Sequence, residues 1–164
     1  EAARAYRQDL TAGADQQSCF YNGRMRWISR NKRVIGLPEF LVAQIRGELF
    51  RLLHRLALSD RDPALVVSHL GANILQITGE GGLGVKLYID DATGLPQRMS
   101  YQLELADGGF AAVEDNFIQW QDAGGVQWPL RILTRRNGRR FSELIYREVK
   151  FNTGLRESDL QQKP

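Results

Sequence analysis

The feature that most constrains this chain is a run of alternating apolar and polar residues between Val85 and Ile132. A period of two is typical of strands that bury one face of a sheet. Clusters of Asp, Gly and Thr interrupt the run at residues 90–94, 107–109 and 122–125, and such residues supply the turns that reverse a chain. The run therefore predicts an antiparallel meander. In one segment, four apolar side chains share a face: Met99, Tyr101, Leu103 and Leu105.

The same signals extend the predicted sheet to six strands. We expect these strands at residues 73–78, 85–90, 97–105, 111–121, 126–135 and 140–151. The last two strands meet at Asn137-Gly138, a pair that favours a two-residue hairpin loop. Asn22-Gly23 predicts a second hairpin within residues 19–29 for the same reason.

One long helix is predicted from Pro38 to Leu58. Proline suits the first turn of a helix, and the polar residues 59–63 end it. A helix that is polar on one side and broadly apolar on the other most simply covers a sheet, which predicts an α+β fold dominated by antiparallel strands. The apolar residues recur at steps of three and four: Phe40, Leu41, Ile45, Leu49, Leu52, Leu53 and Leu56.

The remaining segments carry weaker signals. Residues 1–10 suggest a short helix, and residues 11–17 suggest a polar loop. Residues 64–70 suggest a second short helix or a connection. The helical spacing near the N-terminus rests on Ala2, Ala3, Tyr6 and Leu10.

Length and composition predict one globular domain over residues 1–164. Hydrophobic residues make up 43% and charged residues 25%, and no apolar run reaches the roughly 20 residues of a spanning helix. Cys19 is the only cysteine, so an internal disulfide is excluded and a buried, idle thiol is expected. Residues 1–18 are a poorly defined segment, and residues 155–164 form a polar tail. The start at Glu1 is compatible with processing, trimming or excision from a longer chain.

No motif in the chain predicts catalysis or a cofactor. Residues 79–84 match a dinucleotide-binding glycine pattern, but a predicted strand follows them where that chemistry requires a helix. Asp90 to Gly94 is best interpreted as a turn. His54 and His69 have no Cys, His or acidic companion at metal-ligand spacing. We therefore expect no enzyme activity, no cofactor and no metal.

A cluster of arginines surrounds the predicted Asn137-Gly138 turn. The chain has eighteen arginines and four lysines, and most of the arginines are scattered. A solvated tip, kept soluble by its like charges, is the simplest interpretation of the cluster. Phosphate groups, phospholipid headgroups and nucleic acid are alternative ligands that charge alone would attract. The cluster consists of Arg135, Arg136, Arg139 and Arg140.

The strand faces carry more aromatic and large apolar residues than a thin sheet on one helix needs. Core packing accounts for many of them, and an apolar cavity between a curved sheet and the helix is the sharper hypothesis. Such a cavity would accept an acyl chain. The residues concerned are Tyr88, Met99, Tyr101, Trp120, Trp128 and Tyr146.

Several stretches together resemble the bacterial outer-membrane lipoprotein-sorting proteins, the lipoprotein carrier family. In that pattern a strand ending in Asp meets a Thr-Gly-Leu-Pro turn, and a later strand pair combines aromatic residues, Gly-Val and Pro. The resemblance covers about residues 20–164. The matching stretches are residues 87–90, 93–96, 117–120, 124–126, 128–132 and 149–155, with Tyr21-Asn22-Gly23 and Trp27 near the start.

The resemblance implies a strongly curved, unclosed, barrel-like sheet around a helix, a periplasmic or cell-envelope location, and a lipid or lipidated protein as ligand. Relatives have more strand sequence before residue 19, so residues 1–18 indicate either a truncated chain or an open edge that meets a partner. The arginine that carriers use in the cavity has no matching motif here, and none of the arginines is assigned that role.

We therefore predict a non-enzymatic envelope protein that holds a lipid, an acyl chain or a lipidated protein in an apolar cavity. The alternative is a protein-interaction or sensor module that uses an open sheet edge or the basic hairpin to bind another envelope protein. Peripheral membrane contact fits both hypotheses, and no nucleic-acid partner is expected. The predicted ligand-binding residues are Leu49, Leu53, Met99, Tyr101, Trp128 and Leu130.

Overall fold

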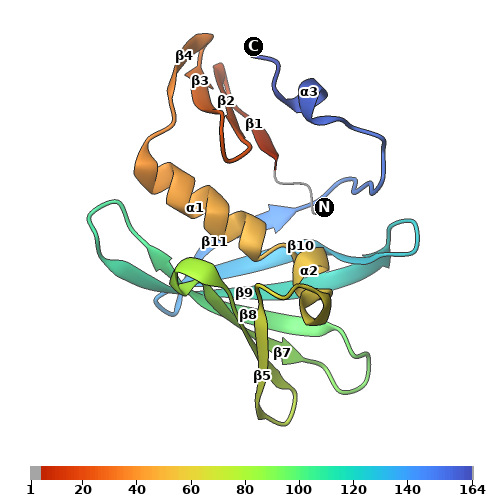
Figure 1. The fold of residues 1–164 in the computed structure, drawn as a ribbon. Helices are drawn as coiled ribbons and strands as arrows, with labels where there is room; N and C mark the ends of the chain where they lie inside the picture. The colour runs from red at the N-terminus through yellow and green to blue at the C-terminus, as the bar shows by residue number, and fades with distance from the viewer. Residues whose placement is uncertain (1–4, 164) are drawn as a thin grey trace. The chain divides into compact units, whose positions relative to one another are not determined.

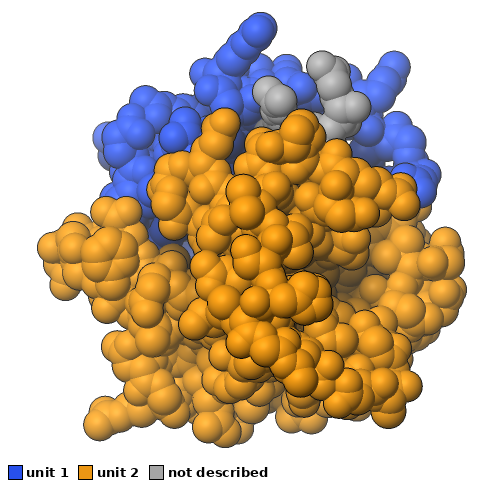
Figure 2. All heavy atoms as spheres, turned by 60° about the horizontal axis from the view of Figure 1, so that its bottom comes forward, with its two compact units in different colours: residues 1–49, 152–164 blue, residues 50–151 orange. Residues whose placement is uncertain are grey.

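The structure is a computed structural model that describes residues 5–163, and it divides the chain into two compact units. Unit 1 comprises residues 1–49 and 152–164, and unit 2 comprises residues 50–151 (Figure 2). Each unit has its own antiparallel sheet and its own hydrophobic core. A single domain over residues 1–164 stays a prediction, since compactness alone does not show that either unit folds by itself.

Unit 1 is built on a four-stranded sheet with the order β1-β2-β3-β4 (Figure 1). Its strands are β1 (Tyr6–Ala12), β2 (Asp15–Tyr21), β3 (Arg26–Arg30) and β4 (Arg33–Gly36). The helix α1 (Glu39–Phe50) follows, and its buried residues join those of the strands in one core. This core contains Cys19, Tyr21, Ile28, Leu37, Val42 and Ile45.

Side-chain hydrogen bonds fix both the turn and the C-terminal segment of unit 1. The hairpin predicted within residues 19–29 is confirmed, but residues 22–25, not two residues, separate β2 from β3; Asn22 Oδ1 accepts the backbone N–H groups of Arg24 and Met25 at 3.0 and 2.6 Å. Arg7 Nη1 donates to the carbonyl oxygen of Leu160 at 3.0 Å. This bond ties α3 (Glu157–Leu160) to the first strand.

Unit 2 is a seven-stranded meander with the order β11-β10-β9-β8-β7-β6-β5 (Figure 1). Five of the six predicted strands begin and end within one residue of the observed bounds, and the sixth ends at Ile145 rather than Phe151. The alternation was a reliable signal because one face of these strands is buried. The strands are β5 (Val66–Gly71), β6 (Ile74–Thr78), β7 (Gly84–Ile89), β8 (Pro96–Glu104), β9 (Phe110–Asp122), β10 (Gln127–Arg136) and β11 (Arg139–Ile145).

The buried face of this sheet forms the core of unit 2 together with the segment that precedes β5. That segment contains α2 (Leu53–Leu56). One short 3₁₀ turn, Ser59–Arg61, precedes β5, and another, Glu80–Gly82, follows β6. Cross-strand pairing aligns the core residues in rows, for example Ile77 with Val85 and Leu87 with Met99. The core contains Phe50, Leu56, Leu65, Ile77, Val85, Leu87, Met99 and Phe117.

The prediction of a curved, barrel-like sheet wrapped around one long helix is wrong. The structure has two sheets, and α1 ends at Phe50 instead of continuing to Leu58. Leu52 interrupts the helix with an extended conformation at φ −56° and ψ 121°. The apolar stripe was too broad for one helix face because it serves two cores: Val42 and Ile45 pack in unit 1, and the residues from Phe50 onward pack in unit 2.

Two further predictions fail at strands that are largely exposed. The predicted N-terminal helix begins in residues 1–4, which lie outside the described part, and its remainder is β1, paired with β2 from Tyr6 opposite Tyr21 to Ala12 opposite Asp15. The segment expected as a short helix or connection is β5, whose six residues are all exposed. A strand without a buried face shows no alternation, so only its pairing partner reveals it.

Within residues 5–163, none of the helices combines the length and the apolar character that crossing a membrane requires.

Gly79, at the end of β6, tests the packing of the unit 2 core. A Cβ atom there would lie 2.9 Å from Phe50 Cε2 and 3.1 Å from Leu65 Cδ2, both in the core. Gly79→Ala should lower the free energy of unfolding by about 1–3 kcal/mol, because the core must shift to admit the methyl group. Urea denaturation measures the change.

Gly84→Ala is the matched control, since a Cβ at Gly84 meets only ordinary contacts of 3.5 Å or more. This variant should be neutral or slightly stabilising, because alanine restricts the unfolded chain more than glycine does. Equal destabilisation by the two substitutions would contradict the described packing around Gly79.

Candidate functional site

The turn between β10 and β11 is a two-residue hairpin tip that is hydrogen-bonded to β9. Asn137 and Gly138 both have positive φ, 48° and 78°, as the predicted two-residue loop requires. The Asn137 backbone N–H donates to the carbonyl oxygen of Ala112 at 2.8 Å, and Asn137 Oδ1 accepts the N–H of Ala112 at 2.9 Å. These two bonds anchor the tip to β9. We call residues 135–141 the basic hairpin.

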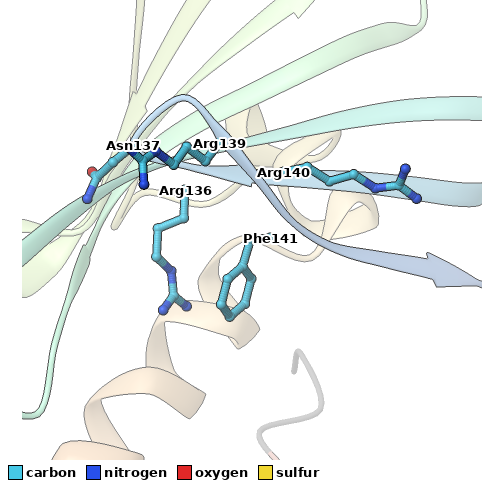
Figure 3. Close-up of a pocket in the computed structure, with 5 residues that line it drawn as sticks. All are labelled: Arg136, Asn137, Arg139, Arg140 and Phe141. Carbon is cyan, nitrogen blue, oxygen red and sulfur yellow. The ribbon is translucent and has the colours of Figure 1, made fainter.

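The basic hairpin encloses a surface pocket of about 440 Å³, whose lining is shown in Figure 3. The guanidinium carbon of Arg136 lies 3.7 Å from the centroid of the Phe141 ring, a cation–π distance. In Figure 3 the Arg136 and Phe141 side chains extend in the same direction, while Arg140 points away from them along β11. The pocket is lined by Arg136, Asn137, Arg139, Arg140 and Phe141.

The four arginines of the basic hairpin differ in how their charge is balanced. Arg140 Nη2 lies 2.5 Å from Glu143 Oε2, and the same carboxylate also pairs with Arg131. Arg135 lies opposite Glu114 in the sheet. Arg136 and Arg139 have no carboxylate within ion-pair distance among the residues that the structure describes.

Glu114 shows that the positive charge on this sheet face acts on its neighbours. Burial opposes ionisation of this carboxyl, but hydrogen bonds from Arg98 and Asn116 and the charges of Arg98 and Arg135 outweigh it, so the pKa of Glu114 lies below its ordinary value. Arg98 Nη1 is 2.6 Å from Glu114 Oε2. Arg135 is therefore partly neutralised, whereas Arg136 and Arg139 have no such carboxylate among the described residues; Arg136 is half-buried and its Nε is buried without a hydrogen-bond partner there.

Large apolar side chains stand exposed beside these charges. Phe141, Leu144 and Ile145 on β11 are 57%, 49% and 63% exposed. Because β11 is the last strand of the sheet, no further strand in the described part of the chain covers it. The basic hairpin and this apolar strand together form a surface that is both cationic and hydrophobic.

The residues predicted to line an acyl cavity are not gathered around one. Leu49 packs at the margin of the unit 1 core, whereas Met99 is 4% exposed inside the unit 2 core with Leu53 and Tyr101 beside it. Trp128 is 9% exposed, and Leu130 is half-buried. Their role in binding a ligand stays a prediction, and protein side chains occupy the space around the buried ones.

Trp128 belongs to an aromatic group of its own. Its ring centroid lies 5.5 Å from that of Phe151, 6.0 Å from that of Tyr146 and 6.3 Å from that of His54. The indole Nε1 is buried without a hydrogen-bond partner among the described residues. Burial lowers the pKa of His54, so its ring is predominantly neutral at pH 7.

A second hollow lies over the middle strands of the seven-stranded sheet. Its volume is about 370 Å³, and its lining combines small residues with polar side chains. Of the six predicted ligand-binding residues, Tyr101 alone contributes to it. The lining residues include Gln76, Gly84, Lys86, Tyr88, Ser100, Gln102 and Ala112.

Sequence reasoning missed a buried carboxyl in the core of unit 2. Asp115 on β9 is 9% exposed and accepts a hydrogen bond from Thr134 Oγ1 on β10 at 2.6 Å. Tyr101 on β8 also hydrogen-bonds it, and the Arg51 guanidinium lies 4.0 Å from the Tyr101 ring centroid. The signal was an acidic residue in the inward register of Ala111, Val113 and Phe117. The carboxyl joins three neighbouring strands.

The described residues contain no cluster of three or more His, Cys, Asp or Glu side chains that could hold a metal ion. His54 lies on α2 and His69 on β5.

Comparison with family models, with curated proteins and with solved structures returns no match. The resemblance to the lipoprotein-sorting family stays a prediction.

The buried Asp115 predicts a pH-dependent stability. Burial raises the pKa of this carboxyl above its ordinary value of 3.8, so ionisation costs more in the folded protein than in the unfolded chain. The resulting loss of folding stability is absent below pH 3.8 and grows as the pH rises toward the pKa of Asp115 in the folded protein. The stability of Asp115→Asn relative to the wild type should therefore increase with pH, as urea denaturation between about pH 3 and pH 7 would measure.

Asp90→Asn provides a control of opposite sign. Hydrogen bonds from the Thr93 side chain and backbone lower the pKa of Asp90, so its stabilising effect is present above pH 3.8 and is lost as the pH falls. The relative stability of Asp90→Asn should fall as the pH rises. If the stability difference of Asp115→Asn does not change with pH, the carboxyl is not desolvated as described.

Proposed function

We propose that this protein is a non-enzymatic binding protein that docks on anionic phospholipid surfaces through the basic hairpin. The observation that carries the proposal is the pocket at the tip, where Arg136 and Arg139 have no carboxylate partner within the described residues 5–163 and lie next to the exposed Phe141.

Arginine is suited to this role because its planar guanidinium binds phosphate oxygens through two parallel hydrogen bonds. The hairpin is held in place by the Asn137–Ala112 bonds, so little ordering is required when an anion binds. Each arginine near an anionic surface contributes about 1 kcal/mol, which predicts a modest and reversible affinity.

The exposed apolar residues favour a membrane over a free phosphate or a nucleic acid. A bilayer interface accepts both components of this surface, since headgroups bind the arginines and the acyl boundary accepts an exposed apolar side chain such as that of Phe141 on β11. Nucleic acid would engage an aromatic ring by stacking a base on it. The Arg136 guanidinium already lies over the Phe141 ring.

The proposal keeps lipid as the ligand class and changes the mode of contact. An acyl chain held between Met99 and Trp128 would have to displace the side chains that bury them. Headgroup binding at the tip needs no such displacement. A cell-envelope location and a lipidated-protein ligand are further proposals that rest on the resemblance, and surface docking depends on neither.

Removing the two arginines of the tip that have no carboxylate partner among the described residues should weaken membrane binding. We expect Arg136→Gln combined with Arg139→Gln to reduce the partition constant by roughly 10- to 30-fold, since each arginine contributes about 1 kcal/mol. The measurement is co-sedimentation with vesicles of phosphatidylglycerol and phosphatidylcholine at about 100 mM salt, compared with vesicles of phosphatidylcholine alone.

A matched control removes two exposed arginines of unit 1, Arg24→Gln and Arg33→Gln. Both double variants lower the formal net charge from +3 to +1, because each loses two positive charges. The control should bind nearly as well as the wild type. An equal loss of vesicle binding in the two double variants would mean that the net charge of the protein, and not the basic hairpin, determines binding. Tighter binding to duplex DNA than to vesicles would also refute the proposal.

A further inference from the structure

The seven-stranded sheet ends in β5, an edge strand without charged residues or proline, whose pairing with β6 is regular from Val66 to His69 and shifts register between His69 and Gly71. All six of its residues are exposed, including Val66 at 62%, Val67 at 39% and Leu70 at 49%. Figure 1 shows β5 at one end of the sheet, and in the described residues it pairs only with β6. Proteins normally block such edges with charged side chains or proline, because free backbone groups there recruit another strand.

The sequence around β5 contains no such charge. From Pro63 to Gly79 the chain has no Asp, Glu, Lys or Arg, although charged residues make up 25% of the whole. This is the longest stretch without these residues in the chain. The β5–β6 hairpin is thus a neutral, apolar edge in an otherwise charged protein.

The opposite edge of the same sheet differs in this respect. β11 begins with Arg139 and Arg140, both exposed, and also carries Glu143, so this edge bears the charged side chains that normally discourage strand pairing. Two copies of β5 bring no like charges together. An edge that carries no charge also offers nothing to select an acidic or a basic partner, whereas identical edges match each other in length and side chains.

We propose that β5 pairs with β5 of a second copy of this chain to form a homodimer. A twofold axis near Ser68 would set the two strands antiparallel, as closed twofold assemblies require, and would join the two sheets into one. The backbone groups left free at the edge would then be hydrogen-bonded. Val66 and Leu70 would pack against their counterparts across the axis.

Sedimentation equilibrium without lipid tests the dimer apart from the membrane proposal. The wild type should approach twice the chain mass of 18.6 kDa as its concentration rises. Val66→Lys combined with Leu70→Lys should weaken the dimer at least ~10-fold, because it brings four lysines together across the axis. A wild type that stays monomeric up to millimolar concentration would refute the dimer.

The control places two lysines on other exposed apolar positions of edge strands, Leu10→Lys on β1 and Ile35→Lys on β4, which are 47% and 51% exposed. It should dimerise like the wild type. Loss of the dimer in this control, or its persistence in the β5 variant, would contradict pairing through β5. If the double variant does not fold, two other measurements test pairing through β5: the dimerisation of the single variant Val66→Lys and the hydrogen exchange of the backbone amides of wild-type β5. β5 amides must exchange more slowly as the concentration rises.

Discussion

The burial of one face of the seven-stranded sheet is the constraint on which the rest of unit 2 depends. Side chains from β6 to β9 meet Phe50, Leu56 and Leu65 in one core, so the inner face is filled by the protein itself. Burying such side chains contributes about 1.5–3 kcal/mol each, and opening the core for a ligand would sacrifice part of that stabilisation. The proposed binding function therefore uses parts of the sheet outside the core, namely its hairpin tips, its edges and its outer face.

The predictability of the fold follows the same division between buried and exposed strands. The bounds of β6 to β10 could be predicted because burial of one face imposes a period of two on their sequence. β1 and β5 have little buried surface, so their sequences carry no such period. The helix prediction failed for another reason. The spacing from Phe40 to Leu56 is helical throughout, and only the presence of two cores explains the break at Leu52.

The candidate site was predictable in position but not in detail. Asn137-Gly138 and the surrounding arginines indicated an exposed basic turn, and the structure places them there. The stacking of Arg136 on Phe141 and the partner of Arg140 depend on a shift in the β10–β11 register after Thr134, which sequence patterns do not reveal. The apolar residues predicted to line a cavity were selected from many positions that face the inside of the protein. Burial alone does not distinguish the side chains of a filled core from those that line a cavity.

Hydrogen exchange in the presence of anionic vesicles is the most direct test of surface docking through the basic hairpin. If the account is correct, addition of phosphatidylglycerol vesicles slows exchange at residues 136–145 and leaves the strands around Met99 and Trp128 unchanged. Phosphatidylcholine vesicles leave both regions unchanged. Protection centred on Met99 and Trp128 would instead indicate a ligand in the interior of the unit, and protection at neither region would contradict lipid binding altogether.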